Sequence, residues 1–200
     1  MNQHILTKEI CEKIDKGLFP TLKNINIPHK QHIITFCGVP GAGKTTLSKQ
    51  LEEKYHMVRI GNDSIRKIIS SLNLITSPEE AELLFQEYNF YLISHLPFKN
   101  KRIILDKSMD RQYKPFFETC KSNNLKYFII RLNVSDPICA LKRLSKREKI
   151  IEQTKVSMKR WFKEYNDCAK NLKADVTLNA ENPNLDELYR KLDNILRETK

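Results

Sequence analysis

The chain has 200 residues, 40% of them apolar and 30% charged, which is typical of a single soluble globular domain. No segment approaches the roughly 18 consecutive apolar residues of a membrane-spanning helix, so we exclude a protein that crosses a membrane. The 35 Lys and Arg outnumber the 24 Asp and Glu. The net charge of +11 predicts either attraction to polyanions, such as nucleotides or nucleic acids, or a lysine-rich surface that serves only solubility.

The N-terminus and the cysteines indicate the compartment in which the protein works. Residues 1–9 contain no basic head followed by an apolar segment, so we expect no secretory signal and a cytoplasmic location. The five cysteines are widely spaced and form no C-x-x-C pair, which favours reduced thiols over disulfides or zinc, and we expect no structural metal. They are Cys11, Cys37, Cys120, Cys139 and Cys168.

Hydrophobic spacing and turn residues predict an alternation of helices and strands. Apolar residues recur at helical spacing over 5–18, and a polar linker with Pro28 follows at 23–31. Short apolar runs predict five strands, at 33–37, 57–60, 102–105, 127–132 and 176–178. Further helices are predicted over 47–54, 64–72, 77–96 and 113–122, from 136, over about 155–170 and over 185–196. This order predicts a three-layer α/β fold, in which helices cover both faces of a mostly parallel, five-stranded sheet.

A glycine-rich segment between the first strand and the next helix is the strongest functional signal. It reads Gly38-Val39-Pro40-Gly41-Ala42-Gly43-Lys44-Thr45-Thr46 and matches the phosphate-binding pattern G-x-x-x-x-G-K-S/T. The glycines let backbone N–H groups approach phosphate oxygens at a helix N-terminus. Lys44 is then placed to reach the outer phosphates of ATP, and the Thr45 hydroxyl to ligate Mg²⁺. The alternative is a glycine-rich turn followed by a lysine without a function.

Two carboxylates follow predicted strands, at the edge where a parallel sheet binds its ligands. Asp63 follows the second strand, and Arg66 lies one helical turn further on the same side. Asp63 is a candidate to accept the proton of an attacking hydroxyl, and Arg66 to hold an acceptor phosphate; the alternatives are a helix cap and a solvated arginine. Asp106, after the third strand, is a candidate to orient Mg²⁺ or to contact the acceptor, or else it caps a turn.

Two helices after the fourth strand carry further candidate residues. The first holds Arg143 and Arg147 four residues apart, hence on one face. Arginines brought over ATP would neutralise charge on the transferred phosphoryl group, so we interpret this helix as a lid rather than as a solvated basic helix. The second mixes Trp161, Phe162 and Tyr165 with basic residues. For these aromatics we favour a buried amphipathic face over a stacking surface for a nucleic-acid strand.

Together these residues resemble the polynucleotide-kinase-like, zeta-toxin-related group of P-loop kinases, and most closely the bacteriophage type of polynucleotide 5′-hydroxyl kinase. The resemblance spans about 33–196. It implies a kinase domain over 33–200 with a lid at about 135–170, preceded by a helix and linker at 1–32, and it implies that ATP and Mg²⁺ are used. The implied catalytic residues are Lys44, Asp63, Arg66 and Arg147. ATP binding is implied for Gly38, Val39, Pro40, Gly41, Ala42, Gly43, Lys44, Thr45, Thr46 and Arg143, metal binding for Thr45 and Asp106, and acceptor binding for Asp63, Arg66 and Asp106.

The segment after the third strand departs from this group. Many relatives follow the aspartate with Thr or Ser, then Asn or His, and later a pair of arginines, whereas this chain reads Asp106-Lys107-Ser108-Met109-Asp110-Arg111-Gln112-Tyr113-Lys114. Because this segment helps to select the acceptor, the acceptor is left open. A 5′-hydroxyl RNA or DNA is preferred, since Arg66 is placed to hold a 3′-side phosphate and the chain is basic. The alternatives are a nucleotide-sugar or small-molecule kinase and a nucleotide-dependent nucleic-acid-binding module that transfers no phosphate.

Overall fold

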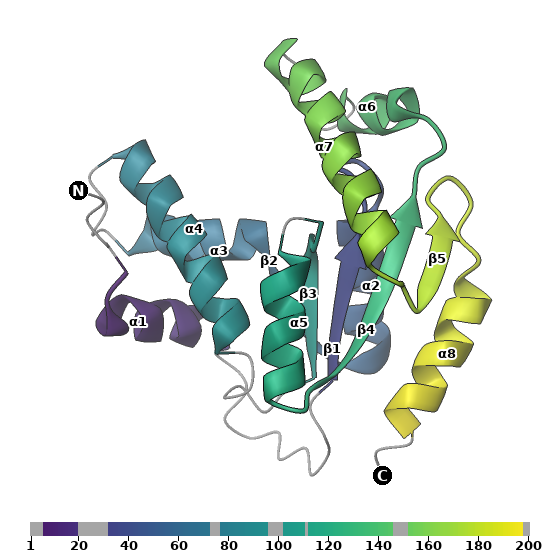
Figure 1. Cartoon of the computed structure of the whole chain (residues 1–200). Helices are drawn as coiled ribbons and strands as arrows, with labels where there is room; N and C mark the ends of the chain where they lie inside the picture. The colour runs from purple at the N-terminus through teal and green to yellow at the C-terminus, as the bar shows by residue number, and fades with distance from the viewer. Residues whose placement is uncertain are drawn as a thin grey trace.

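A single parallel sheet forms the centre of the molecule. The computed structural model of the chain describes residues 6–19, 32–72, 77–95, 102–110, 112–145 and 152–197. Within these ranges five parallel strands are ordered β2-β3-β1-β4-β5, and helices cover both faces of the sheet (Figure 1). The predicted α/β fold is therefore confirmed. The strands are β1 (His32–Cys37), β2 (Val58–Gly61), β3 (Ile103–Ser108), β4 (Lys126–Asn133) and β5 (Val176–Asn179).

The helices follow the predicted order closely, and most of their ends differ from the predicted ones by a few residues. None of those described is both long and apolar enough to cross a membrane. They are α1 (Lys8–Leu18), α2 (Lys44–Tyr55), α3 (Asn62–Ser71), α4 (Pro78–Ser94), α5 (Tyr113–Ser122), α6 (Pro137–Ser145), α7 (Glu152–Asn171) and α8 (Leu185–Arg197).

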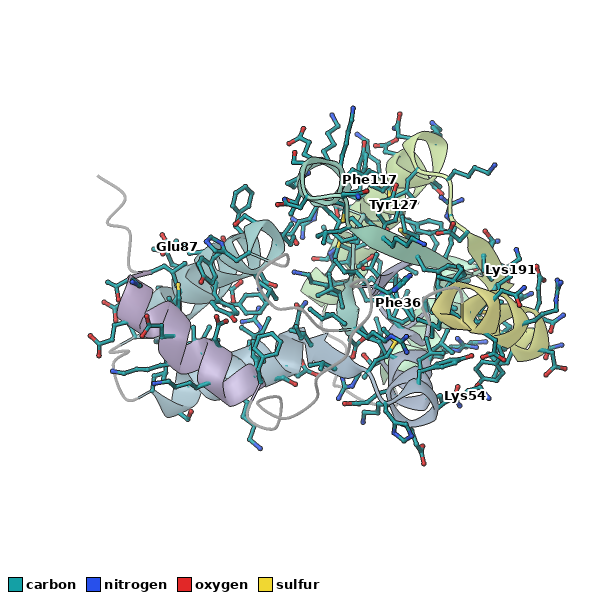
Figure 2. All side chains as sticks on the ribbon, turned by 90° about the horizontal axis from the view of Figure 1, so that it is seen from below. Phe36, Lys54, Glu87, Phe117, Tyr127 and Lys191 are labelled. Atoms are coloured by element: carbon teal, nitrogen blue, oxygen red, sulfur yellow. The ribbon has the colours of Figure 1, made fainter. Side chains whose placement is uncertain are left out.

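The central strands β1 and β3 and the middle of β4 are buried on both faces because their side chains alternate between two hydrophobic layers. Ile33 and Ile129 join the layer that contains residues of α3, α4 and α5, whereas Ile34 and Ile130 join the layer that contains residues of α2 and α8. Each such side chain contributes about 1.5–3 kcal/mol by leaving water. On the first face, aromatic rings also pack α5 onto β4, as Figure 2 shows for the labelled pair Phe117 and Tyr127.

The N-terminal helix α1 belongs to the same core as the rest of the chain. Ile14 is fully buried in the first layer, and the Tyr88 hydroxyl of α4 donates to Asp15 Oδ1 over 2.6 Å. At the start of the helix, the backbone N–H of Leu6 donates to Glu87 of α4, which Figure 2 labels near α1. The predicted boundary at residue 32 thus separates two segments that share one hydrophobic core. The part of the predicted helix before residue 6 lies outside the described residues.

Strand β3 extends beyond its predicted end at Leu105, as far as Ser108. Its pairing with β1 shifts register between Thr35 and Phe36, so that Asp106 and Lys107 form a bulge. In the sequence, the charged residues Asp106 and Lys107 after the apolar run indicated that the strand ends at Leu105. The fold instead buries both of them, because the bulge directs Asp106 toward α2 and Lys107 toward α4.

Candidate active site

The glycine-rich loop lies between β1 and α2 and is packed tightly on two sides. Gly38 (φ 151°) and Gly41 (φ 83°) adopt backbone conformations that L side chains rarely reach. A Cβ on Gly38 would lie 2.9 Å from the carbonyl oxygen of Leu132, and a Cβ on Gly41 2.6 Å from that of Ala140. A Cβ on Gly43 would meet no atom of the described residues within 4 Å. The loop is therefore fixed against β4 and α6 and open at the N-terminus of α2, which fits a bound phosphate.

Lys44, the first residue of α2, folds back over this loop. Its Nζ donates to the carbonyl oxygens of Gly38 and Val39, the latter over 2.9 Å. Burial lowers the pKa of the Lys44 ammonium to about 8, while the nearby carboxylates of Asp110 and Asp106 act in the opposite direction. A phosphate bound in the loop would add negative charge beside the ammonium and favour its protonated form. The position of Lys44 is thus suited to an anionic ligand.

The two residues predicted to bind Mg²⁺ lie together. The Thr45 hydroxyl donates to Asp106 Oδ1 over 3.2 Å, and the buried Asp106 side chain also accepts from Arg59 Nη1 over 2.8 Å. Arg59 Nε in turn lies 2.8 Å from Glu52 of α2. Hydroxyl and carboxylate oxygens are ligand types that Mg²⁺ uses, so the donor set fits the ion.

Sequence reasoning missed Arg59. Its only signal was a charged residue within the short apolar strand 57–60, which indicates a partner inside the protein. That partner is Asp106, whose buried carboxylate forms an ion pair with Arg59 Nη1 over 2.8 Å.

Two of the three predicted acceptor residues, Asp63 and Arg66, lie on α3, which follows β2 directly. Because β2 pairs with β3, α3 starts at the same edge of the sheet as Asp106. Asp63, in the first turn, and Arg66 are both exposed. The Arg66 guanidinium forms an ion pair with Glu82 of α4 and lies 3.7 Å from the centroid of the Phe85 ring. Because Glu82 and Phe85 of α4 hold its guanidinium, Arg66 is not fully solvated, and its guanidinium points toward α4 rather than toward the glycine-rich loop.

Lys107 is a second buried cation that the sequence analysis left without a role. Its Nζ donates to Asn89 Oδ1 of α4 over 3.0 Å, and both side chains are buried. Burial lowers the pKa of the Lys107 ammonium to about 7. Lys107 is therefore held on the α4 side of the sheet, whereas Lys44 lies over the glycine-rich loop.

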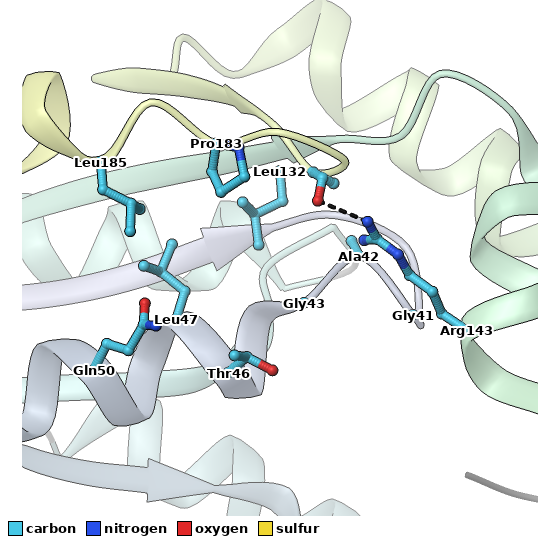
Figure 3. Close-up of a pocket in the computed structure, with 11 residues that line it drawn as sticks. Gly41, Ala42, Gly43, Thr46, Leu47, Gln50, Leu132, Arg143, Pro183 and Leu185 are labelled. Carbon is cyan, nitrogen blue, oxygen red and sulfur yellow. Dashed lines mark hydrogen bonds between the residues drawn. The ribbon is translucent and has the colours of Figure 1, made fainter. Parts of the chain in front are cut away.

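A pocket of about 410 Å³ lies beside the glycine-rich loop (Figure 3). Leu47, Leu132 and Leu185 give it apolar walls, and Gly43 and the N-terminus of α2 form one end. Figure 3 shows Arg143 reaching across from α6, where its Nη2 donates to the carbonyl oxygen of Ala180 over 2.9 Å. A flat apolar base attached to phosphates matches this combination of walls and helix N-terminus. The second predicted lid arginine, Arg147, lies outside the described residues.

The aromatic residues of α7 pack inward. Tyr165 is buried, and Trp161 and Phe162 are partly buried against the second hydrophobic layer. The Tyr165 hydroxyl donates to Asn133 Oδ1 at the end of β4 over 3.3 Å. The favoured prediction of a buried amphipathic face is confirmed, and these rings are not a free stacking surface.

Comparisons with known proteins support this architecture. The model of a family described as AAA domain, AAA_33, matches residues 33–166. Shikimate kinase from Bacteroides thetaiotaomicron is similar in structure, with a TM-score of 0.55 at 19% identity over 82% of this chain and 98% of that one. Shikimate kinase from Acinetobacter baumannii, solved in complex with shikimate, has a TM-score of 0.54 at 17% identity over 84% and 94% of the two chains.

A chain of the Pnkp1/Rnl/Hen1 RNA repair complex is also similar, with a TM-score of 0.52 at 14% identity over 75% of this chain and 49% of that one. No curated protein sequence matches the chain. At such low identities, the likeness to solved structures shows a shared fold, that of the P-loop kinases.

Proposed function

The chain belongs to the AAA_33 family of AAA domains and has the P-loop kinase fold, and we propose that it transfers the γ-phosphate of ATP to a hydroxyl group, preferentially the 5′-hydroxyl of a polynucleotide. One observation carries this proposal. A phosphate-binding loop, a hydroxyl–carboxylate pair suited to Mg²⁺, and an exposed carboxylate with an arginine one turn away all lie at one edge of the sheet. Phosphoryl transfer needs this combination, because it depends on positioning and charge neutralisation.

The nucleotide side of the proposed reaction uses the loop and the pocket beside it. The N–H groups at the start of α2 would bind phosphate oxygens, Lys44 would contact the outer phosphates, and the base would lie in the pocket beneath Arg143. Thr45 and Asp106 would hold Mg²⁺, directly or through water. When bound, the ion neutralises charge on the phosphates.

The acceptor side uses α3. Asp63 would accept the proton of the attacking hydroxyl. Arg66 has a planar guanidinium supported by the ring of Phe85, and this group is suited to a phosphate that follows that hydroxyl along the chain. The net charge of +11 favours a polyanionic acceptor over a neutral metabolite.

A transfer assay with labelled ATP tests the proposal. The acceptors are 5′-hydroxyl RNA, 5′-hydroxyl DNA, nucleoside 3′-monophosphates, a nucleotide sugar and a panel of small hydroxyl compounds that includes shikimate. We expect label on the polynucleotides and, more weakly, on the 3′-monophosphates. Label on a sugar or a small compound alone would contradict the polynucleotide acceptor and leave the kinase standing. ATP binding without transfer to any acceptor would favour the binding-module alternative.

Replacing Arg66 with alanine should raise the KM for a polynucleotide acceptor and leave the KM for ATP nearly unchanged. The expected increase is roughly 10- to 100-fold, because charge-assisted hydrogen bonds to the acceptor phosphate are lost. Steady-state kinetics with each substrate varied in turn measure both constants.

Glu82→Gln is the matched control, because it breaks the same ion pair from the α4 side. Freed from Glu82, the Arg66 guanidinium should bind the acceptor phosphate equally well or up to about fivefold better, since an exposed ion pair contributes little. If Glu82→Gln raised the acceptor KM as much as Arg66→Ala does, the effect of both variants would come from loss of the ion pair between α3 and α4. Arg66 would then have no demonstrated contact with the acceptor phosphate.

A further inference from the structure

Three potential metal ligands meet beside the start of the glycine-rich loop, close enough for the Asp110 carboxylate to act on Lys44. Cys37 ends β1 immediately before the loop, Asp110 follows β3, and Cys168 lies on α7. One ligand atom from each of the three lies within 4.8 Å of the other two. These residues are far apart in the sequence, and the fold alone brings them together.

The donor types in this cluster suit a zinc ion. Both cysteines are free and almost completely buried, at 1% and 2% exposed for Cys37 and Cys168. Thiolate sulfurs and carboxylate oxygens are ligands of tetrahedral Zn²⁺, and zinc sites with only three protein ligands keep the fourth position for water or another group. Mg²⁺ prefers oxygen ligands alone, so this cluster differs in kind from the pair formed by Thr45 and Asp106.

Asp110 provides an independent observation that points to a ligand. Its Oδ1 is buried and has no hydrogen-bond partner within the described part of the chain. The Ser108 side chain and the Gly38 backbone N–H form hydrogen bonds with the Asp110 carboxyl and orient it. The carboxyl is therefore held in place while its Oδ1 has no partner in the ranges that the structure describes. A buried acceptor without a partner is costly, and a coordinated cation would remove that cost.

The charge around the cluster also fits. Two thiolates, one carboxylate and Zn²⁺ together carry a net charge of −1. Arg131 of β4 pairs with Cys37 in the sheet, which places a positive charge beside the cluster. The Arg131 Nε is itself buried without a partner among the described residues, and Nη2 donates to the Leu172 carbonyl oxygen at the end of α7. The guanidinium is therefore placed to neutralise the complex and to support its ligands.

We propose that Cys37, Asp110 and Cys168 form a zinc site that ties α7 to the base of the glycine-rich loop. Binding forms two Zn–S bonds and one Zn–O bond, releases the protons of the two thiols, and leaves one tetrahedral position for water. Because the ion would join β1, the segment after β3 and α7, it fixes the lid helices relative to the loop. This proposal reverses the expectation of no structural metal, which rested on the absence of C-x-x-C pairs. It does not depend on the proposed kinase activity.

Cobalt and zinc titrations test the site on the full-length, reduced and chelator-treated protein. Co²⁺ should bind once per chain with a near-ultraviolet absorption band from thiolate ligands, and Zn²⁺ should displace it. Zn²⁺ should also raise the melting temperature, since an ion that binds only the folded state stabilises it. Cys168→Ser and Asp110→Asn should weaken Co²⁺ binding by more than about 100-fold, because loss of even a supporting second-layer group costs 10- to 100-fold.

The control is Cys120→Ser in α5, which changes a buried thiol that is not part of the cluster. Burial raises the pKa of the Cys120 thiol to about 12. This variant should bind Co²⁺ and respond to Zn²⁺ as the unchanged protein does. The proposal is overturned if no thiolate absorption band appears, if Cys168→Ser binds Co²⁺ as tightly as the unchanged protein does, or if Zn²⁺ leaves the melting temperature unchanged. A Cys37–Cys168 disulfide that forms in place of metal binding would also overturn it. None of these outcomes bears on phosphoryl transfer, which is measured separately.

Discussion

Replacing Lys44 with alanine is expected to lower the rate of phosphoryl transfer by roughly 10²- to 10³-fold or more, toward the uncatalysed background. The Lys44 ammonium lies over the glycine-rich loop, bound to the carbonyl oxygens of Gly38 and Val39, within reach of a nucleotide whose transferred phosphoryl group would build up negative charge. A single pre-positioned donor to such charge typically contributes this much to catalysis. The folded state should be nearly unaffected, because the substitution removes only two hydrogen bonds to carbonyl oxygens of the loop.

The measurement is transfer from labelled ATP, with the melting temperature and circular dichroism as checks on folding. Lys49→Ala is the matched control, since it removes an exposed lysine from the same helix and should retain full activity. Undiminished transfer by Lys44→Ala would defeat the assignment of a P-loop kinase activity. Equal losses in both variants would indicate a general effect of charge on α2 and not a specific role for Lys44.

Local signals in the sequence predicted most of the fold and the place of the glycine-rich loop within it. The loop lies between β1 and α2 as predicted, because its glycines, Lys44 and the flanking strand and helix are adjacent in the chain. The start of α4 near residue 77 is also as predicted: Ser77 accepts from the backbone N–H of Glu80, and Pro78 occupies the first turn. Such features depend only on neighbouring residues, so residue type and spacing are sufficient to predict them.

The partners of the charged residues were not predictable in this way. Arg59 of β2 pairs with Asp106 of the neighbouring strand β3, and Arg66 of α3 pairs with Glu82 of α4. Each pairing depends on which elements pack side by side and on the register between them, and spacing along the chain does not encode either. The bulge in β3 is a similar case, because its position follows from pairing with β1.

The cluster of Cys37, Asp110 and Cys168 shows the same limit for metal sites. Rules for cysteine spacing detect ligands that lie close in the sequence, as in C-x-x-C pairs. Here the parallel sheet brings the end of β1 next to the segment after β3, and α7 packs over both. A ligand set built from three separate segments leaves no local pattern.

Replacing Asp63 with asparagine distinguishes the proposed kinase from a nucleotide-dependent binding module. The side chain keeps its size and its place in the first turn of α3, but it can no longer accept a proton. If Asp63 is the general base, kcat should fall by about 10²- to 10⁴-fold while the affinity for ATP stays the same. Calorimetric titration measures ATP binding, and the labelled transfer assay measures kcat.

Asp186→Asn is the matched control for this experiment. Asp186 is also an exposed carboxylate in the first turn of a helix, α8, so both variants lose the same favourable interaction with a helix N-terminus, about 0.3–1 kcal/mol. Asp63 follows β2 next to Asp106 of β3, whereas Asp186 follows Leu185 in the wall of the proposed nucleotide pocket, so a loss of kcat at unchanged ATP affinity is expected for Asp63→Asn alone. If Asp63→Asn transfers phosphate as fast as the original protein, Asp63 is not the general base. If the original protein binds ATP but transfers phosphate to no acceptor, the binding module becomes the better interpretation. A loss of kcat confined to Asp63→Asn would tie the chemistry to α3, because the helix-terminus contribution is common to both variants and cancels in the comparison.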